Sequence, residues 1–218
     1  SILKTDPEIS VIICHHRGDF IRKCVAMVDC SLYVDYEIIV ITSDEALAVK
    51  GRHGALVFHD PSGPAAKRNH GVRQAKGKYF AFFDDDVEVE PTCLFNLRRA
   101  FNLNYDFCKK EEVGFVFGKL YNMEHRNRFD EAGGFLTWTG FIWSRAAQNE
   151  IDKGQYPHHE LIFAGKSASC MIRRDVFHLT GGFDVDFGIL GEESDLAWRV
   201  WLYGFKVVWD PLSTAYQA

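Results

Sequence analysis

The sequence lacks long hydrophobic runs and lacks any excess of basic residues. No apolar stretch approaches the roughly 18 residues that a membrane-spanning helix needs, and the first residues contain no apolar core of a signal peptide. We therefore expect a cytoplasmic protein, with peripheral association with the inner face of a membrane as the alternative. The net charge of −5 gives little electrostatic support for nucleic-acid binding, so no nucleic-acid partner is expected.

Paired cysteine motifs are also absent. None of the six cysteines has the spacing of a CxxC pair or of zinc-finger ligands. Most of them lie within apolar segments, where cysteine behaves as a small hydrophobic residue. We therefore predict reduced thiols, as in other cytosolic proteins. The six residues are Cys14, Cys24, Cys30, Cys93, Cys108 and Cys170.

The composition and the order of the apolar segments predict one α/β domain over residues 1–218. Hydrophobic residues make up 47% of the chain, enough for a sizeable core. Short apolar runs alternate with helical patterns as far as residue 101, which predicts a parallel sheet with right-handed crossovers and a nucleotide-binding architecture. The expected strands are 9–14, 37–41, 55–58 and 78–83, and the expected helices are 20–28 and 65–76.

The second half of the chain, residues 102–218, is less regular. Gly181 and Gly182 are expected to end a short helix in the left-handed conformation. Residues 126–160 show no clear period, and long irregular segments in compact domains are usually functional. The expected strands here are 113–121, 167–172 and 205–209, and the expected helices are 173–179 and 192–203.

The irregular segment contains two tryptophans and two adjacent histidines. Trp138 and Trp143 could line a groove or could cover the sheet, and the sequence favours neither. His158, His159 and Glu160 have side chains that can bind metals, but three consecutive residues rarely converge on one ion. We therefore predict a solvated turn at these three residues.

Three consecutive carboxylates, Asp84, Asp85 and Asp86, directly follow the aromatic run at residues 78–83. This pattern predicts a buried strand that delivers them at its carboxyl end, the edge where open α/β sheets bind ligands. Adjacent carboxylates repel one another, and a divalent cation relieves that repulsion. Mg²⁺ is usually held by one or two carboxylates together with water and substrate phosphates. A metal site is therefore favoured over a solvated turn that caps the helix after Pro91.

Six short motifs follow one another between residues 9 and 211. Each motif alone is weak evidence, but together they resemble the family 2 glycosyltransferases of the GT-A fold, a Rossmann-like α/β fold whose mostly parallel sheet is flanked by helices. The motifs are Ile9-Ser10-Val11-Ile12-Ile13, Glu37-Ile38-Ile39-Val40, Lys67-Arg68-Asn69-His70-Gly71 with Ala75-Lys76-Gly77-Lys78-Tyr79, Phe83-Asp84-Asp85-Asp86, Gly181-Gly182-Phe183-Asp184, and Gly191-Glu192-Glu193-Ser194-Asp195-Leu196.

The resemblance implies that a sugar is transferred from a nucleotide-diphospho-sugar donor, of the UDP or GDP type, to an acceptor hydroxyl with inversion at the anomeric carbon. A carbohydrate or lipid-linked acceptor is expected, as in polysaccharide or glycoconjugate biosynthesis. Asp84 and Asp86 take the places of the family's Asp-x-Asp motif and would bind Mn²⁺ or Mg²⁺. On the acceptor side we expect Trp143, Gly165 and Asp195. At the nucleotide sugar we expect Cys14, His15, Arg17, Ser43, Asp44, Lys67, Arg68, Asn69, Asp84 and Asp85.

The sequence departs from the family pattern in three places. Cys14-His15-His16-Arg17 stands where Pro-Thr-x-Asn is usual. Thr42-Ser43, followed by Asp44, replaces an Asp-Asp pair that commonly touches the base, and Asp44 is the expected substitute. Gln217 stands close to the place of a metal-binding histidine; since glutamine is a weaker ligand, a reduced metal affinity or a displaced ligand is expected.

The catalytic base is expected at the motif that begins with Gly191. Its counterpart in the family is Glu-Asp-x-Asp-Leu, in which the first Asp is the usual base, and Glu193 takes that place. A carboxylate can accept the proton of the attacking hydroxyl when it lies within hydrogen-bond reach. Glu192 is the alternative base, and Asp195 with Arg199 also predicts a simple intrahelical ion pair.

Two other functions stay open at this point. A metal-dependent nucleotidyltransferase would also combine a nucleotide, a metal and carboxylates, but it favours a glycine-rich phosphate loop after the first strand, where this chain has His15-His16-Arg17-Gly18. A sugar- or nucleotide-binding module without catalysis would explain the altered motifs. The carboxylates kept in both halves of the chain favour an enzyme.

Overall fold

The computed structural model describes residues 6–16, 18–51, 54–146, 149–188 and 190–218. The strands are β1 (Ile9–His15), β2 (Tyr36–Thr42), β3 (Ala55–His59), β4 (Tyr79–Asp84), β5 (Val87–Val89), β6 (Val113–Asn122), β7 (Phe129–Glu131), β8 (Gly134–Leu136), β9 (Ile142–Ser144), β10 (Glu160–Leu161), β11 (Ser169–Arg173) and β12 (Lys206–Gln217). The helices are α1 (Phe20–Asp29), α2 (Pro64–Gln74), α3 (Cys93–Ala100), α4 (Arg174–Thr180) and α5 (Glu192–Leu202), with 3₁₀ turns η1 (Lys110–Glu112) and η2 (Val185–Phe187).

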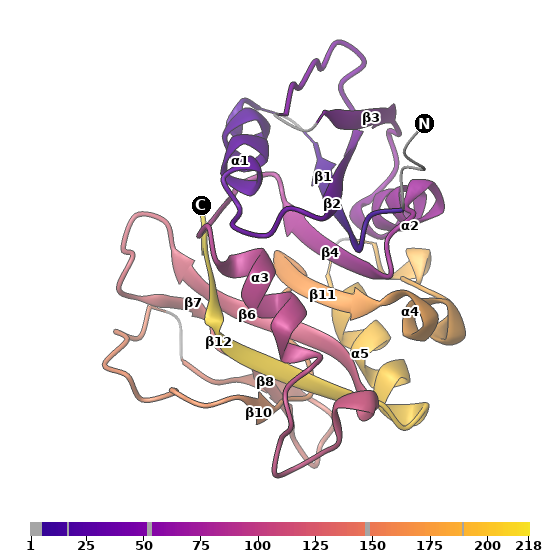
Figure 1. The fold of residues 1–218 in the computed structure, drawn as a ribbon. Coiled ribbons are helices and arrows are strands. Elements are labelled where there is room, and N and C mark those ends of the chain that lie inside the picture. The colour runs from indigo at the N-terminus through magenta and orange to yellow at the C-terminus, as the bar shows by residue number, and fades with distance from the viewer. Residues whose placement is uncertain (1–5, 17, 52–53, 147–148, 189) are drawn as a thin grey trace.

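A ten-stranded sheet crosses the molecule in the order β10-β12-β6-β11-β4-β1-β2-β3, with β5 and β7 paired to β12 and β6 (Figure 1). β1 is parallel to both β2 and β4, and β2 is parallel to β3. The parallel sheet predicted for residues 1–101 is therefore confirmed. β11 is antiparallel to its neighbours β4 and β6, and β12 is parallel to β6.

Helices cover both faces of this sheet. α1 and α3 pack on one face, where Val11 and Ile13 of β1 are buried. α2, α4 and α5 pack on the other face, where Ile12 of the same strand is buried (Figure 1). Because helices cover both faces of the sheet, these strands are apolar at successive positions without alternation. They could therefore be predicted from the sequence as continuous apolar runs.

The last strand is longer than the sequence predicted. β12 extends to Gln217, well beyond the expected end at residue 209, and its far end pairs with β5. Its register shifts between Asp210 and Thr214. The Asp210 carboxylate accepts a hydrogen bond from the backbone N–H of Leu212 at 3.0 Å and another from the Ser213 hydroxyl, which stabilises this irregularity. The polar residues Asp210 and Ser213 interrupt the apolar pattern, so the sequence did not indicate that the strand continues.

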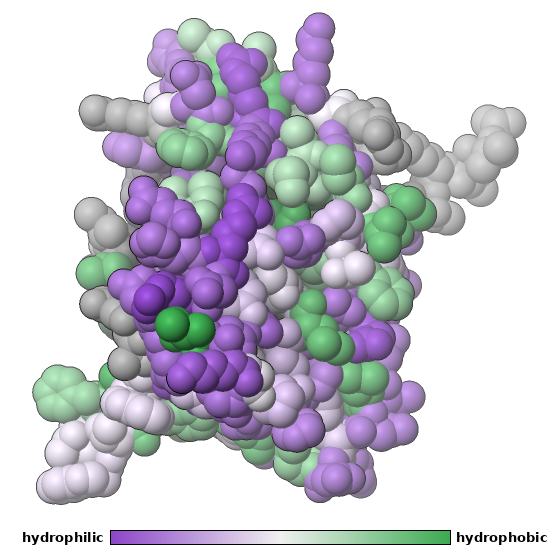
Figure 2. Space-filling view, turned by 90° about the vertical axis from the view of Figure 1, so that its left-hand side faces the viewer, coloured by the Kyte–Doolittle hydropathy of each residue, from purple (hydrophilic) through white to green (hydrophobic). Residues whose placement is uncertain are grey.

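Residues 126–160 are more regular than predicted. They contain β7 and the β8–β9 hairpin, whose three-residue strands are too short to show a period. Trp138 is 97% exposed and Trp143 is 60% exposed, so these side chains do not cover the sheet. In Figure 2, a projection of pale and green side chains stands out at the bottom of the molecule, and Figure 1 places β8 in its lower part.

The predicted solvated turn holds for His158, which is exposed in a bend, and is wrong for His159 and Glu160. His159 Nε2 lies 3.0 Å from Oδ1 of Asp210, which is fully buried, and Glu160 begins β10. The pairing joins residues that are far apart in sequence, so the local pattern could not indicate it. The left-handed end of α4 is confirmed, with φ angles of 87° at Gly181 and 77° at Gly182. No helix among the described residues is long and apolar enough to cross a membrane.

The six cysteines give the first testable prediction. All six are free thiols in the structure. Burial raises the pKa of Cys14 and of Cys93 to about 12, so these thiols stay protonated and react slowly. We expect a thiol reagent to modify the exposed Cys30 first in the folded protein, and six thiols per chain after unfolding without reductant. A count below six would contradict the prediction of reduced cysteines.

Candidate active site

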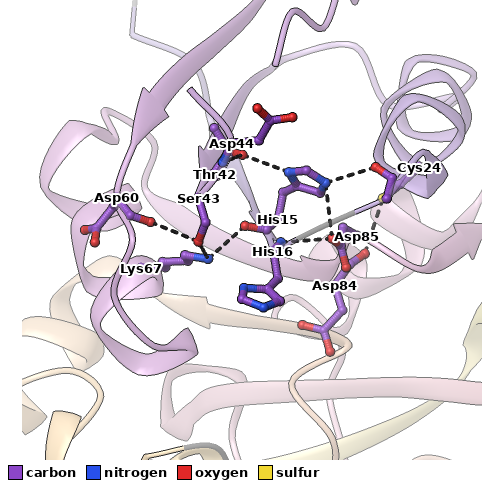
Figure 3. A network of polar contacts seen from close by, with 11 residues as sticks. His15, His16, Cys24, Thr42, Ser43, Asp44, Asp60, Lys67, Asp84 and Asp85 are labelled. Atoms are coloured by element: carbon purple, nitrogen blue, oxygen red, sulfur yellow. Dashed lines mark hydrogen bonds and ion pairs between the residues drawn. The ribbon is translucent and has the colours of Figure 1, made fainter. Parts of the chain in front are cut away.

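The candidate site lies at the carboxyl ends of the parallel strands β1, β2 and β4. His15 ends β1 and Thr42 ends β2, and these two residues are register partners. Cys14 is the register partner of Asp84, the last residue of β4. The strands thus bring together polar residues from three separate segments, as Figure 3 shows.

The imidazole of His15 is buried and has partners at both nitrogens. Nδ1 lies 2.8 Å from the Thr42 hydroxyl and Nε2 lies 3.1 Å from the Gly18 carbonyl oxygen. Asp85 Oδ2 lies 3.8 Å from His15 Nε2 and accepts a hydrogen bond from the backbone N–H of His16 at 3.1 Å. His15 therefore shapes the loop after β1 and links it to the aspartates. Arg17, also expected in the site, lies outside the described residues.

Lys67, expected at the nucleotide sugar, lies on α2 and is buried. Its Nζ donates to the His15 carbonyl oxygen at 2.8 Å and to Ser43 Oγ at 2.6 Å (Figure 3). Burial lowers the pKa of Lys67. The lysine fastens the ends of β1 and β2 to each other. Asp44, the next residue after Ser43, is exposed and its carboxylate accepts a hydrogen bond from the backbone N–H of Ala46.

Arg68, the next residue on α2, is 4% exposed and lies between two carboxylates. Nη2 is 2.9 Å from Asp84 Oδ1, and Nη1 is 2.5 Å from Glu192 Oε1. Burial alone would lower the pKa of Arg68, but the charges of Asp84 and Glu192 outweigh it and raise that pKa. The sequence placed this guanidinium at the nucleotide sugar, and the structure gives it two carboxylate partners.

Asn69 clamps α2 onto the Gly181–Asp184 motif. Its Nδ2 donates to the Phe183 carbonyl oxygen at 2.7 Å, and its Oδ1 accepts from the Phe183 N–H at 3.0 Å. The helix can approach the sheet closely because residue 71 is glycine: a Cβ there would lie 2.5 Å from Ile12 Cγ2. Sequence reasoning placed Asn69 at the nucleotide sugar, and the structure shows its amide bonded to the backbone.

The turn between β4 and β5 holds Asp85 and Asp86. Burial, and then the charges of Asp84 and Asp85, raise the pKa of Asp86 to about 6. Asp86 Oδ1 and Gln217 Oε1 are both buried and have no hydrogen-bond partner. The end of β12 meets this turn, since the Ala218 N–H donates to the Asp86 carbonyl oxygen at 3.3 Å.

These oxygens fit a hard divalent cation. A bound Mg²⁺ or Mn²⁺ would lower the repulsion among the aspartate carboxylates. It would also accept lone pairs from the two buried oxygens that have no hydrogen-bond donor. Within the described ranges, no group of three or more His, Cys, Asp or Glu side chains is placed so that it could hold a metal ion. That is consistent with a cation held by one or two carboxylates and completed by water and phosphate.

Helix α5 begins with Glu192 and Glu193, directly after Gly191, whose φ of 95° is left-handed. Glu192 is 2% exposed and its Oε2 is buried without a hydrogen-bond partner. Glu193 is partly buried, and burial together with the charge of Glu192 raises its pKa to about 7. A carboxyl group with such a pKa can accept a proton efficiently near neutral pH.

Besides Trp143, the sequence placed Asp195 and Gly165 on the acceptor side, and both have structural contacts. Asp195 forms the intrahelical ion pair with Arg199, whose Nε lies 3.0 Å from Asp195 Oδ2, as its spacing predicted. Gly165 lies against Phe117: a Cβ at position 165 would come within 2.8 Å of that ring. Sequence reasoning missed the buried carboxylate–arginine–carboxylate bridge, because its members are 16 and 124 residues apart.

Sequence comparison places the chain among known proteins. The sequence model for glycosyl transferase family 2 matches residues 10–178. The chain is 28% identical over 221 residues to the O-antigen biosynthesis protein RfbC of Myxococcus xanthus, covering 93% of this chain and 16% of that protein. It is 31% identical over 101 residues to the uncharacterized glycosyltransferase YibD of Escherichia coli K12, covering 42% of this chain and 29% of that protein. The chain thus matches less than a third of the length of either relative.

Solved structures share the fold at low sequence identity. GalNAc-T7 with UDP, GalNAc and Mn²⁺ superposes with a TM-score of 0.71 at 17% identity, covering 98% of this chain and 44% of that one. The mannosyltransferase PcManGT from Pyrobaculum calidifontis, with GDP-Man and Mn²⁺, gives 0.63 at 14% identity and covers 99% and 58%. TarS residues 1–349 of S. aureus give 0.66 at 14% identity and cover 97% and 60%. The chain has the GT-A fold and belongs to the family 2 glycosyltransferases.

Proposed function

We propose that this chain is the catalytic region of an inverting glycosyltransferase that uses a nucleotide-diphospho-sugar donor. The observation that carries the proposal is the convergence of two groups of carboxylates at one sheet edge. The first group is Asp84 at the end of β4 with Asp85 and Asp86 in the turn that follows, and the second is Glu192 with Glu193 at the start of α5. Arg68 joins Asp84 to Glu192. The structural neighbours solved with UDP and Mn²⁺ or with GDP-Man and Mn²⁺ support a donor of this kind.

The donor side of the proposed site has a metal-binding turn and a supporting framework. Asp84 and Asp86 would hold Mn²⁺ or Mg²⁺, with Gln217 beside them. When bound, the cation neutralises the charge of the leaving nucleoside diphosphate. Lys67 holds the ends of β1 and β2 together. The nucleotide would lie on the surface that these strand ends and the turn after β4 form, made up of Cys14, His15, Ser43, Asp44 and Asp85.

Glu193 is the proposed base. As the acceptor oxygen bonds to the anomeric carbon, the bond from that carbon to the diphosphate oxygen breaks on the opposite side, and the acceptor proton passes to the Glu193 carboxylate. Glu192 is less suited to this step, because it is buried and its Oε1 is held by Arg68. Glu193 is partly exposed and can meet an acceptor.

The pH profile follows from this assignment. Glu193 must be ionised to accept a proton, and its pKa is raised to about 7 by burial and by Glu192. We therefore expect kcat/KM to rise as the pH increases through about 7 and then to level off. Measurement between pH 5 and pH 9, roughly the range in which such profiles are read, tests this expectation. The expectation is contradicted if the rise in kcat/KM reports a pKa near the ordinary value for a glutamate, or if the rise near pH 7 persists in Glu193→Gln.

The β8–β9 hairpin is proposed to form part of the acceptor side. Trp143 lies on β9 with its ring 6.1 Å from that of Phe135, and it is largely exposed. An exposed indole offers a flat apolar surface with a polar N–H, suited to contact with a sugar or lipid-linked acceptor. Trp143→Ala is expected to raise the KM for the acceptor about tenfold while changing donor affinity less than about twofold.

Leu212→Ala, an exposed substitution on β12, is a matched control for loss of surface apolar area. It should leave the KM for the acceptor and the affinity for the donor unchanged. If Trp143→Ala unfolds the protein, or weakens the donor and the acceptor equally, the hairpin does not have the proposed role.

A donor screen tests the function as a whole. The protein is incubated with UDP- and GDP-sugars and Mn²⁺, and both thermal unfolding and the release of nucleoside diphosphate are measured, since a ligand that binds the folded state raises its stability. We expect stabilisation by one donor class and slow release of its diphosphate. Release of pyrophosphate from nucleoside triphosphates would indicate a nucleotidyltransferase, and binding without any turnover would indicate a non-catalytic module.

A further inference from the structure

The buried guanidinium of Arg68 connects residues from distant parts of the chain. It bonds Asp84 at the end of β4, 16 residues away, and Glu192 at the start of α5, 124 residues away. The guanidinium carbon also lies 5.5 Å from the centre of the Phe183 ring. Charge-assisted hydrogen bonds in a buried setting are strong and directional, so this contact fixes the first turn of α5 relative to β4.

Glu192 has one satisfied and one unsatisfied oxygen. Oε1 accepts from Arg68, but Oε2 is buried and no described residue donates a hydrogen bond to it. Buried acceptors in native proteins nearly always have a donor. The Glu193 and Glu192 side chains lie within hydrogen-bond reach of each other, so the Glu193 carboxyl becomes such a donor once it is protonated. The charged groups that act most on Glu193 are Glu192 on its own helix and Arg68 on α2.

We propose that Arg68 and Glu192 form a positioning bridge that orients Glu193 and receives a hydrogen bond from it after it has taken the acceptor proton. The inference rests on the proposed function and specifies how its base would be held. The proton moves from the acceptor hydroxyl to Glu193 and remains there. Glu192, held by Arg68 through Oε1, accepts the new O–H, so no further reactant is needed.

The bridge requires the forked shape of arginine. A lysine at position 68 could pair with Asp84 or with Glu192, but its single ammonium group cannot span both in the same geometry. Arg68→Lys therefore preserves the charge while breaking the bridge. Glu192→Gln preserves the shape and the hydrogen bond from Arg68, but removes the negative charge next to Glu193.

Two readouts separate positioning from a merely structural role. The first is the titration of Glu193 itself, followed by NMR of carboxyl-labelled glutamate without metal or donor. The second compares kcat/KM for transfer with calorimetric binding of UDP or GDP in the presence of Mn²⁺. Arg98→Lys is the matched control, because Arg98 pairs with Glu8 at 2.6 Å and packs over Tyr79 at the opposite edge of the sheet.

We expect Glu192→Gln to move the Glu193 titration to lower pH by about one unit, since the neighbouring charge is lost. We expect Arg68→Lys to lower kcat/KM about 100-fold, as for a misplaced reacting group, with diphosphate binding within about threefold of the unaltered protein. Arg98→Lys should change neither readout. The double variant Arg68→Gln/Glu192→Gln, which leaves no buried unpaired charge at position 192, covers the case in which Arg68→Lys fails to fold.

An unchanged Glu193 titration in folded Glu192→Gln would overturn the proposal. So would a loss of diphosphate binding in Arg68→Lys as large as its loss of transfer, because the bridge would then serve the donor. Failure of the proposed function gives a different result: no diphosphate binds to the unaltered protein, or Glu193→Gln transfers sugar normally, whatever the titration of Glu193 shows.

Discussion

Replacing Glu193 with glutamine is expected to lower sugar transfer by roughly two to four orders of magnitude, the usual cost of losing a general base. The amide has the same shape as the carboxylate but cannot accept a proton. Glu193 makes no contact with Asp84 or Asp86 among the described interactions, so binding of nucleoside diphosphate with Mn²⁺ should persist. Single-turnover transfer and calorimetric diphosphate binding, measured on the same preparation, test both parts.

Glu192→Gln is the informative comparison for this variant. If Glu192→Gln is inactive while Glu193→Gln keeps near-normal turnover, the base is Glu192. If both variants remain fully active, a carboxylate base on α5 is excluded. A variant that loses diphosphate binding together with transfer would show that the first turn of α5 belongs to the donor site.

Replacing Asp86 with alanine is expected to abolish the part of nucleoside diphosphate binding that depends on metal. The carboxylate lies in a turn with two other aspartates, and its Oδ1 is buried without a donor. Without the cation these carboxylates repel the diphosphate, whereas with it they support binding. Calorimetric titration of UDP and GDP with Mn²⁺, with Mg²⁺ and with a chelator measures the metal-dependent part.

Glu88→Gln provides the control for this experiment. Glu88 is a buried carboxylate two residues further along, but it is paired with Lys23 and Arg126. Its loss should lower stability and leave the metal dependence intact. If the unaltered protein binds diphosphate equally well with metal and with chelator, Asp84 and Asp86 do not form a metal site.

The sequence predicted the parallel part of the fold because burial on both faces leaves a continuous apolar run. β1, β2 and β4 are runs of this kind, each followed by polar residues at the edge where the site lies. The three-residue strands β7, β8 and β9 were missed, since they are shorter than any readable period. The full length of β12 was missed because Asp210 and Ser213 interrupt its apolar pattern.

The sequence indicated the residue types of the candidate site better than their contacts. Asp84, Asp86 and Glu193 were identified from short motifs that need no knowledge of distant residues. The partners of Lys67 and Arg68 lie in segments distant in sequence that fold against α2, so the sequence placed this basic pair at the nucleotide sugar and could not indicate these contacts. A buried charge is visible in sequence only when its partner is also known.

The path of β11 limits how this protein can move. It is hydrogen-bonded to β4 on one side and to β6 on the other. Residues 1–101, the proposed nucleotide-binding half, and residues 102–218, the proposed acceptor-binding half, therefore share a continuous sheet. The halves therefore cannot swing apart about a flexible linker, as the lobes of hinged enzymes do. Entry of the donor and exit of the product would depend on segments outside the sheet, such as the β8–β9 hairpin and the approach to α5, where Gly188 and Gly191 adopt positive φ angles. Turnover limited by the opening of these segments would respond to solvent viscosity and to substitutions at the two glycines, far more than to changes along β11.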